Sequence, residues 1–300
     1  MDDATKPAFR VILLTHGGSE KVLECLAAVE GVQVVGVFVE TKVTPNRAFT
    51  EKLKRSVRYD GYAGTVAKLA CKIFSKSKGE DDERTRISNE RNSVAEVART
   101  HNVPFHLVDD YHSAETRALI AEAHADLGVV WGTNILKETV FRIPRLGCIN
   151  LHQGLAPIYR GGPPVFWELF NDERELGLTI HFVASKVDSG DIVLQETVPL
   201  EYDYESYGTQ FERFLADYGK SLIEPCANLV AQAVGLIAGG QTAWRPQDVS
   251  QGKRYRLPIK TEKDELRRRL RERYKTEARR DKSEKTAREL VARNLRAGDR

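Results

Sequence analysis

Three polar residues of the kind that acyl transfer requires lie in two short segments of the chain. Asn150 and His152 belong to the run Ile149–Gln153, and Asp188 belongs to Val187–Asp191. They supply a carboxamide, an imidazole and a carboxylate. Acyl transfer from an activated donor to an amine uses such groups, because charge develops on the carbonyl oxygen and protons must move. The sequence therefore predicts one polar site built from these three residues.

The residues around this trio predict how it is positioned. An apolar run before His152 predicts a buried strand, whereas Pro157 and Gly161 predict an irregular loop after it. Two residues apart on an extended strand, Asn150 and His152 point to the same face. Alone, either would more often be a satisfied structural residue. Asp188 strengthens the site hypothesis, because it interrupts two apolar runs that predict paired strands.

The two segments resemble the catalytic core of the 10-formyltetrahydrofolate-dependent formyltransferases, which include glycinamide ribonucleotide formyltransferase and the catalytic domain of methionyl-tRNA formyltransferase. That family shows roughly Asn-x-His-x-Ser-Leu-Leu-Pro-x-x-x-Gly and then an Asp-x-Gly loop. The matching residues here are Asn150, His152, Leu155, Pro157, Gly161, Asp188 and Gly190. The resemblance is strongest over residues 125–198, continues more weakly over 9–244, and does not cover the C-terminal remainder.

Three positions depart from the family pattern. Gln153 stands where proline is usual, Gly154 where serine is usual, and Ala156 where the second leucine is usual. All three polar positions are kept. The departures are therefore expected to affect the shape of the loop and the choice of substrate more than the chemistry.

The resemblance implies transfer of a formyl group from 10-formyltetrahydrofolate, the co-substrate, to a primary amine. Asn150 and His152 would donate hydrogen bonds to the formyl oxygen as it gains charge. Asp188 would hold the imidazole, favour its charged form, and relay the proton of the amine toward the departing folate nitrogen. We expect no metal, since the chemistry needs none and the four cysteines lack metal-ligand spacing.

The acceptor is expected to be the amine of a small metabolite, such as glycinamide ribonucleotide or a nucleotide-linked aminosugar. Methionyl-tRNA is a less favoured acceptor, because about 55 residues follow Trp244 and their composition does not suit the C-terminal β-barrel of the tRNA enzymes. We therefore do not expect tRNA as a partner. Two alternatives stay open: a 10-formyltetrahydrofolate hydrolase and a folate-binding paralogue without catalysis. The oligomeric state is not determined.

The first half of the chain predicts an α/β fold. Short apolar runs at 11–14, 32–39 and 127–131 alternate with segments of helical spacing. Such alternation predicts a mostly parallel sheet with helices on both faces and with ligands at the carboxyl ends of its strands. The resemblance implies a Rossmann-like formyltransferase fold, and we place this catalytic domain at residues 8–245.

Further binding residues are expected in the loops. The candidate substrate-binding residues are Gly17, Gly18, Ser19, Pro157 and Gly161. The turn at 17–19 follows a strand and opens a helix, so its backbone N–H groups could hold a phosphate. The neighbouring Glu20 would repel phosphate, and a plain strand-to-helix turn is the alternative. By the resemblance, the candidate folate contacts are Asn134, Ile135, Leu136 and Val187.

Two segments lie outside the family pattern. Residues 44–87 predict an insertion that ends in a charged linker at 76–86. Residues 246–300 predict a charged C-terminal extension, helical or disordered. From Ile259 to Arg300 it holds sixteen Lys and Arg residues against nine Asp and Glu residues. This composition predicts an exposed helical tail that frays, with contact to an anionic partner as the alternative.

The composition is that of an ordinary globular protein, with 41% hydrophobic and 30% charged residues in 300. The four unclustered cysteines predict reduced, packed thiols and a cytoplasmic location. No apolar run approaches the roughly 20 residues that span a bilayer, so we expect no membrane role. The polar N-terminus also disfavours a secretory signal.

Overall fold

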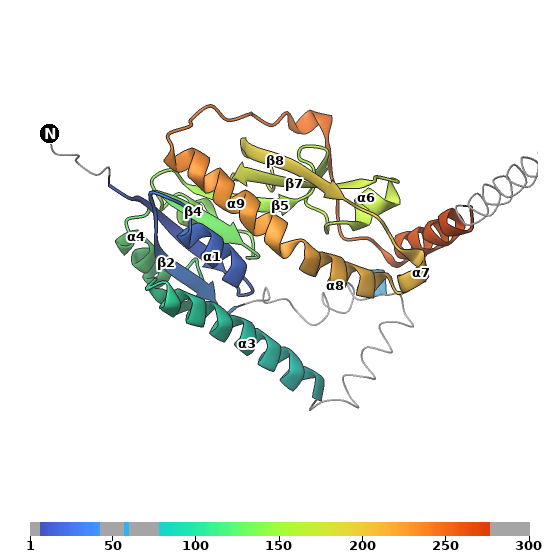
Figure 1. Cartoon of the computed structure of the whole chain (residues 1–300), viewed down its shortest axis with the longest axis horizontal. Coiled ribbons are helices and arrows are strands. Elements are labelled where there is room, and N and C mark those ends of the chain that lie inside the picture. The colour runs from blue at the N-terminus through green and yellow to red at the C-terminus, as the bar shows by residue number, and fades with distance from the viewer. Residues whose placement is uncertain (1–6, 43–56, 60–77, 277–300) are drawn as a thin grey trace, which may run out of the picture.

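A seven-stranded sheet forms the centre of the molecule, in the order β3-β2-β1-β4-β5-β7-β8 (Figure 1). The structure is a computed structural model that describes residues 7–42, 57–59 and 78–276. The parallel strands are β1 (Phe9–Thr15), β2 (Val32–Glu40), β3 (Phe105–Val108), β4 (Leu127–Trp131) and β5 (Cys148–Gln153). Strands β7 (Glu175–Phe182) and β8 (Ile192–Pro199) complete one edge in antiparallel pairing. The predicted mostly parallel sheet is confirmed.

Helices cover both faces of this sheet, as predicted. Successive side chains of β1 point to opposite faces, so Val11 and Leu13 join one buried cluster while Ile12 and Leu14 join another. The first cluster is covered by α1 (Glu20–Ala27), α3 (Lys78–Thr100) and α9 (Ile223–Ala238). The second is covered by α4 (Ala114–Glu122) and α5 (Glu138–Phe141).

The C-terminal segment packs against the rest of the fold. Helices α6 (Phe166–Phe170), α7 (Tyr204–Tyr207) and α8 (Phe211–Ser221) lie beside the helix at 260–276 (Figure 1). Leu266 and Leu270 of that helix are 1% and 3% exposed and belong to the first core cluster. A short parallel pairing also joins β6 (Tyr159–Arg160) to β9 (Lys253–Arg254). The expectation of an exposed tail is wrong for residues 260–276.

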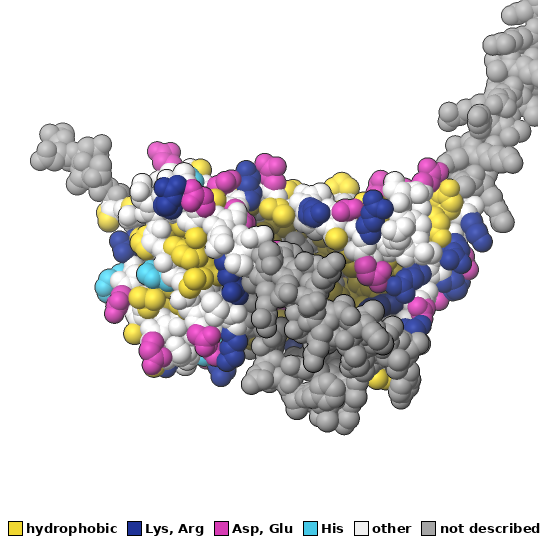
Figure 2. Space-filling model, turned by 90° about the horizontal axis from the view of Figure 1, so that it is seen from below, with side chains coloured by type: hydrophobic (Ala, Val, Ile, Leu, Met, Phe, Trp, Pro, Cys, Tyr) yellow, Lys and Arg dark blue, Asp and Glu magenta, His cyan; other side chains and the backbone are white. Residues whose placement is uncertain are grey.

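The tail was predicted to be exposed because charged residues far outnumber the few apolar residues in its sequence. Leu266 and Leu270 are four residues apart and so share one helix face, while most of the charges lie on the other faces. Figure 2 shows basic and acidic side chains interspersed at the end of the molecule that carries this helix. Two of the ion pairs there are Arg267 with Glu212 and Arg268 with Glu265, each at 2.8 Å.

The predicted insertion at 44–87 lies mostly outside the described residues. The prediction of a charged linker at 76–86 is wrong, because helix α3 spans Lys78–Thr100 and includes most of that segment. Lys, Glu and Arg are good helix formers, so a charged run suits a helix as well as a linker.

The described residues include no single helix that is long and apolar enough to cross a membrane. Helices α8 and α9 meet the length and composition limits only as a pair, bent by 41°. Seven residues of α9 are buried against the sheet and its neighbours.

Candidate active site

Strand β5 carries Asn150 and His152 into the centre of the site. Its first residues, Cys148 and Ile149, are each 1% exposed, and this buried start fixes the register of the strand. On the neighbouring antiparallel strand β7, His181 lies opposite Asn150. The Nδ2 atom of Asn150 and the Nε2 atom of His181 are 3.5 Å apart. The strand predicted from the apolar run is confirmed.

Asp188 lies in the loop between β7 and β8 and folds back over β5. Its Oδ2 atom accepts a hydrogen bond of 2.9 Å from the backbone N–H of Gly161 and lies 3.5 Å from Nδ1 of His152. Its Oδ1 atom lies 3.5 Å from Nε2 of His181. The backbone φ of Asp188 is +49°, a conformation that Asp adopts more readily than most residues. The structure thus places Asn150, His152, Asp188 and Gly161 together.

His181 is a site residue that the sequence analysis missed. Its side chain is 3% exposed and touches both Asn150 and Asp188. Its Nδ1–H donates to the carbonyl of Phe182 at 2.8 Å, which leaves Nε2 facing the site. The sequence feature that could have indicated this role is the position of His181, a polar residue inside the apolar run that precedes Asp188. The pairing of His181 with Asn150 depends on the register of β5 and β7, which the sequence pattern does not give.

The proton of the neutral His152 ring lies on the side away from Asp188. Nε2 lies 2.7 Å from the carbonyl oxygen of Tyr159, which can only accept, so Nε2 carries the hydrogen. In the neutral ring Nδ1 is then an unprotonated acceptor facing Asp188. Protonation of Nδ1 would turn that contact into an ion pair.

Burial lowers the pKa of His152, and the negative charge of Asp188 only partly offsets this effect. The expectation that Asp188 keeps the imidazole charged is therefore wrong for the free protein, because desolvation is the larger effect. For Asp188 burial acts to raise the pKa. The hydrogen bond from His181, the positive charge of each histidine when it is protonated, and the N–H of Gly161 together lower it. The site holds an ionised carboxylate beside a neutral imidazole.

Gly154 gives His152 room for this orientation. A Cβ atom at position 154 would lie 2.5 Å from Nε2 of His152 and 3.0 Å from the carbonyl oxygen of Tyr159. A side chain there would press on the imidazole ring that binds Tyr159. Glycine at this position, where the family usually has serine, thus leaves space for the His152 ring to bind the carbonyl of Tyr159.

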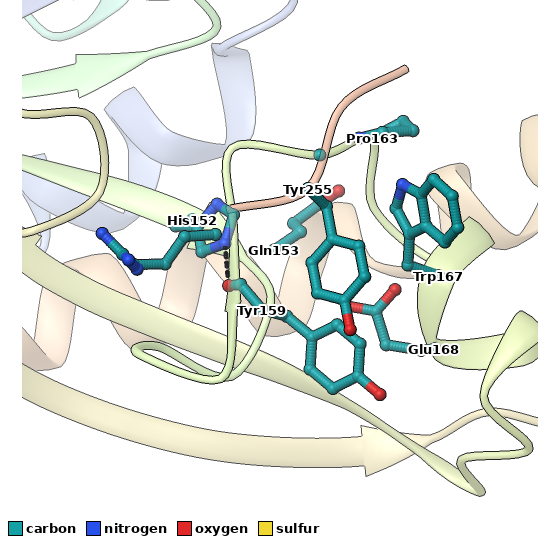
Figure 3. Close-up of a pocket in the computed structure, with 9 residues that line it drawn as sticks. His152, Gln153, Tyr159, Pro163, Trp167, Glu168 and Tyr255 are labelled. Carbon is teal, nitrogen blue, oxygen red and sulfur yellow. Dashed lines mark hydrogen bonds between the residues drawn. The ribbon is translucent and has the colours of Figure 1, made fainter. Parts of the chain in front are cut away.

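A small pocket adjoins His152 (Figure 3). Its lining residues are His152, Gln153, Tyr159, Arg160, Gly162, Pro163, Trp167, Glu168 and Tyr255. The rings of Tyr159 and Tyr255 stack with centroids 5.2 Å apart, and Trp167 lies 5.1 Å from Tyr255. Tyr255 comes from the C-terminal extension, so that extension supplies part of the wall. No sequence pattern indicated Tyr255 as a site residue, because its position at the pocket depends on the pairing of β6 with β9.

The turn at 17–19 lies at the end of β1, as predicted. Gly17 and Gly18 have φ values of +124° and +62°, which favour glycine. Ser19 is 1% exposed and precedes α1, but its side chain does not cap the helix. His16 lies 2.7 Å from Glu40 at the neighbouring strand end. Phosphate binding by this turn stays a prediction.

The predicted folate contacts divide by exposure. Ile135 is 73% exposed, whereas Leu136 is 6% exposed and packs in the second core cluster. Asn134 donates through Nδ2 to the carbonyl of Lys42 at 3.2 Å, and Val187 is half-buried beside Asp188. Ile135 thus has an exposed apolar side chain, whereas Leu136 is part of the core. Pro157 follows β5 in the loop that leads to Gly161, as predicted.

No cluster of three or more His, Cys, Asp or Glu side chains suited to a metal ion occurs within 7–42, 57–59 and 78–276.

Comparison with known proteins places these residues in a family context. Methionyl-tRNA formyltransferases from Chlorobium chlorochromatii (strain CaD3) and Pelotomaculum thermopropionicum are each 34% identical to the chain, over 161 and 174 residues. These matches cover 54% and 58% of this chain and 48% and 52% of the relatives. The chain therefore spans about half the length of the curated relatives that it matches.

The sheet and its helices also match solved structures. Glycinamide ribonucleotide transformylase 1 from Symbiobacterium toebii gives a TM-score of 0.52 at 20% identity, over 81% of this chain and 96% of that one. A formyltetrahydrofolate deformylase from Pseudomonas syringae pv. tomato gives 0.51 at 15% identity, over 80% of this chain and 66% of that one. At these identities the likeness shows a shared fold and no more, and it confirms the predicted Rossmann-like formyltransferase fold.

The relatives contradict the expectation that tRNA is not a partner. That expectation depended on the composition after Trp244, whereas the similarity to proteins named methionyl-tRNA formyltransferase covers only about half of the chain. A family model described as formyl transferase matches residues 43–224. This match includes all of Asn150, His152 and Asp188, and the chain belongs to the formyl transferase family.

Proposed function

We propose that the protein transfers a formyl group from 10-formyltetrahydrofolate to a primary amine. The observation that carries this proposal is the convergence of Asn150, His152 and Asp188 within a chain of the formyl transferase family. The three come from two segments and meet with an ionised carboxylate 3.5 Å from a neutral imidazole. This is the arrangement that a proton-coupled attack by an amine requires.

Each polar group has a distinct role in this proposal. Asn150 Nδ2 has only a long contact of 3.5 Å and is available to donate to the formyl oxygen as it gains charge. The Nε2–H of His152 donates to the carbonyl oxygen of Tyr159, so His152 is not a second donor to the formyl oxygen in this arrangement. Its Nδ1 can instead receive a proton from the amine, and the carboxylate of Asp188 stabilises the resulting imidazolium. The proton then passes to the folate nitrogen as the C–N bond breaks.

Two apolar side chains near the ends of strands are candidates to contact the co-substrate. Ile135 presents an exposed apolar side chain in the loop after β4, and Val187 is half-buried next to Asp188. Burial of a flat ring against such side chains is favourable. We infer that these two residues, with the backbone at Asn134, contact the folate.

The α-amino group of methionyl-tRNA is the first acceptor to test. The support is the name carried by the curated relatives at 34% identity. The small-metabolite amine that the sequence favoured has weaker support, because the structure named for glycinamide ribonucleotide shares the fold at 20% identity.

The test incubates the full chain with 10-formyltetrahydrofolate and follows the release of tetrahydrofolate. The reactions contain methionyl-tRNA, uncharged tRNA, glycinamide ribonucleotide, a nucleotide-linked aminosugar, or no acceptor. Turnover with an amine and not with uncharged tRNA supports the proposal and identifies the acceptor class. Formate release without an acceptor would establish a hydrolase instead, and tight donor binding without any turnover would establish a non-catalytic folate-binding protein.

A further inference from the structure

Glu168 is a buried carboxylate that the proposed chemistry does not use. It lies in the middle of α6, is 3% exposed, and lines the pocket beside His152. Its Oε2 atom is fully buried and has no hydrogen-bond partner among the described residues. Burying a carboxylate oxygen that has no hydrogen-bond partner is unfavourable. For packing alone, an uncharged side chain at this position would be more favourable.

The surroundings of Glu168 hold it in this position. Val165, just before α6, has a φ of +74°, which a β-branched residue rarely adopts and which persists only when the structure around it enforces it. The neighbouring side chains Phe166, Trp167 and Leu169 are all buried, so α6 cannot rotate to expose the carboxylate. In Figure 3 the carboxylate lies among Gln153, Tyr159, Trp167 and Tyr255.

The size of the pocket limits what can meet this carboxylate. The cavity has a volume of about 10 Å³, which corresponds to one water-sized group. A terminal amino or ammonium group is of that size and carries the hydrogens that an unpartnered carboxylate oxygen accepts. Because His152 lines the same pocket, a group bound there lies beside the imidazole ring whose Nδ1 atom faces Asp188.

The geometry points to Glu168 as the residue that binds the ammonium group of the acceptor and removes one of its protons. This inference depends on the proposed formyl transfer and adds an acceptor-side residue to it. The carboxylate takes one proton from R–NH3⁺, and the neutral nitrogen attacks the formyl carbon. When the intermediate collapses, the bond from that carbon to the folate nitrogen breaks. The folate nitrogen takes a second proton of the amine, and Glu168 returns its proton to solvent.

The protonation behaviour of Glu168 agrees with this role. Burial, and to a smaller extent the nearby Glu173, raise its pKa, whereas hydrogen bonds from the backbone N–H groups of Glu168 and Val165 lower it. The net result is a pKa of about 7. A proton acceptor works best when its pKa is close to the working pH. The other titratable or charged groups around the pocket are His152, Tyr159, Arg160, Tyr218 and Tyr255.

The test compares wild type, Glu168→Gln and Glu175→Gln, using the amine that the wild-type protein formylates. Gln keeps the shape of the side chain and removes its charge, and Glu175 is an exposed carboxylate of the next strand. We expect kcat/KM for the amine to rise with pH through about 7 in wild type and in Glu175→Gln. Glu168→Gln should lose this rise and fall at least about tenfold above pH 7, while the Kd for the folate donor stays the same.

A pH profile of Glu168→Gln that matches wild type would overturn the inference and leave the formyl transfer intact. Failure of wild type to formylate any amine would instead reject the proposed function before the variants are compared. Glu168→Asp, which keeps the charge, should retain the rise with pH even if its rate is lower. If Glu168→Gln does not fold, Glu168→Met of similar size replaces it, with the same expected loss.

Discussion

The Nε2 atom of His181 lies 3.5 Å from Oδ1 of Asp188, on the opposite side of the carboxylate from His152. One carboxylate therefore lies between two imidazoles that come from neighbouring antiparallel strands. His181 and His152 both act to lower the pKa of Asp188. The charge of Asp188 acts to raise the pKa of His152 against the larger effect of burial. A change at either histidine is therefore expected to change the protonation of Asp188, and a change at Asp188 that of His152.

Removal of either central group should abolish most of the activity. We expect Asp188→Asn and His152→Ala each to lower kcat by roughly 100-fold or more, because these groups act mainly on the transition state. Asp191→Asn is the matched control, since Asp191 is exposed at the end of the same loop. Steady-state kinetics measures kcat for each variant, and a thermal melt shows whether the variant is folded. Near-wild-type turnover in either variant would contradict the assignment.

Replacement of His181 should change the pH dependence of the reaction. His181→Phe removes a hydrogen bond and a charge that lower the pKa of Asp188, so that pKa should rise. The acidic limb of the kcat profile should then move to higher pH, with kcat lower by about tenfold, or roughly 1.4 kcal/mol, and KM little changed. His106→Phe is the control, because His106 stacks on Phe38 in another part of the sheet. An unmoved acidic limb would show that His181 has only a packing role.

The buried Glu168 should make the stability of the protein depend on pH. Its pKa rises from 4.5 to about 7 on folding, so between these values the folded state binds a proton that the unfolded state releases. The free energy of unfolding should therefore fall as pH rises through this window. Glu168→Gln lacks this loss, so its Tm relative to wild type should increase from pH 4.5 to pH 8. A Tm difference that does not vary with pH would show that Glu168 titrates as an ordinary carboxylate.

The helix at 260–276 should contribute to the stability of the fold. Leu266→Ala and Leu270→Ala should each lower the free energy of unfolding by about 2–5 kcal/mol, as expected for large-to-small changes in a core. Leu257→Ala, at a position that is 38% exposed, should have a much smaller effect. Truncation after Pro258 should lower the Tm for the same reason. Denaturant unfolding makes the comparison, and an unchanged midpoint after truncation would mean that the helix packs without stabilising the fold.

The sequence by itself determined the parallel sheet and the central polar groups. Strand β4 was predicted with its observed bounds, since a short apolar run bounded by polar residues has few alternatives in an α/β pattern. Asn150 and His152 were predicted to share a face because the side-chain period of a strand is two. Asp188 was assigned to a loop because it interrupts two apolar strands. These features depend on local chemistry and spacing.

Only the tertiary structure decided which distant residues complete the site. His181 reaches Asp188 through the register of β5 against β7, and Tyr255 reaches the pocket through the pairing of β6 with β9. The neutral state of His152 likewise depends on how deeply the ring is buried, which outweighs the neighbouring carboxylate. Strand register, docking of the C-terminal segment and desolvation are all set by contacts between residues far apart in the chain. No local pattern of residue types contains that information.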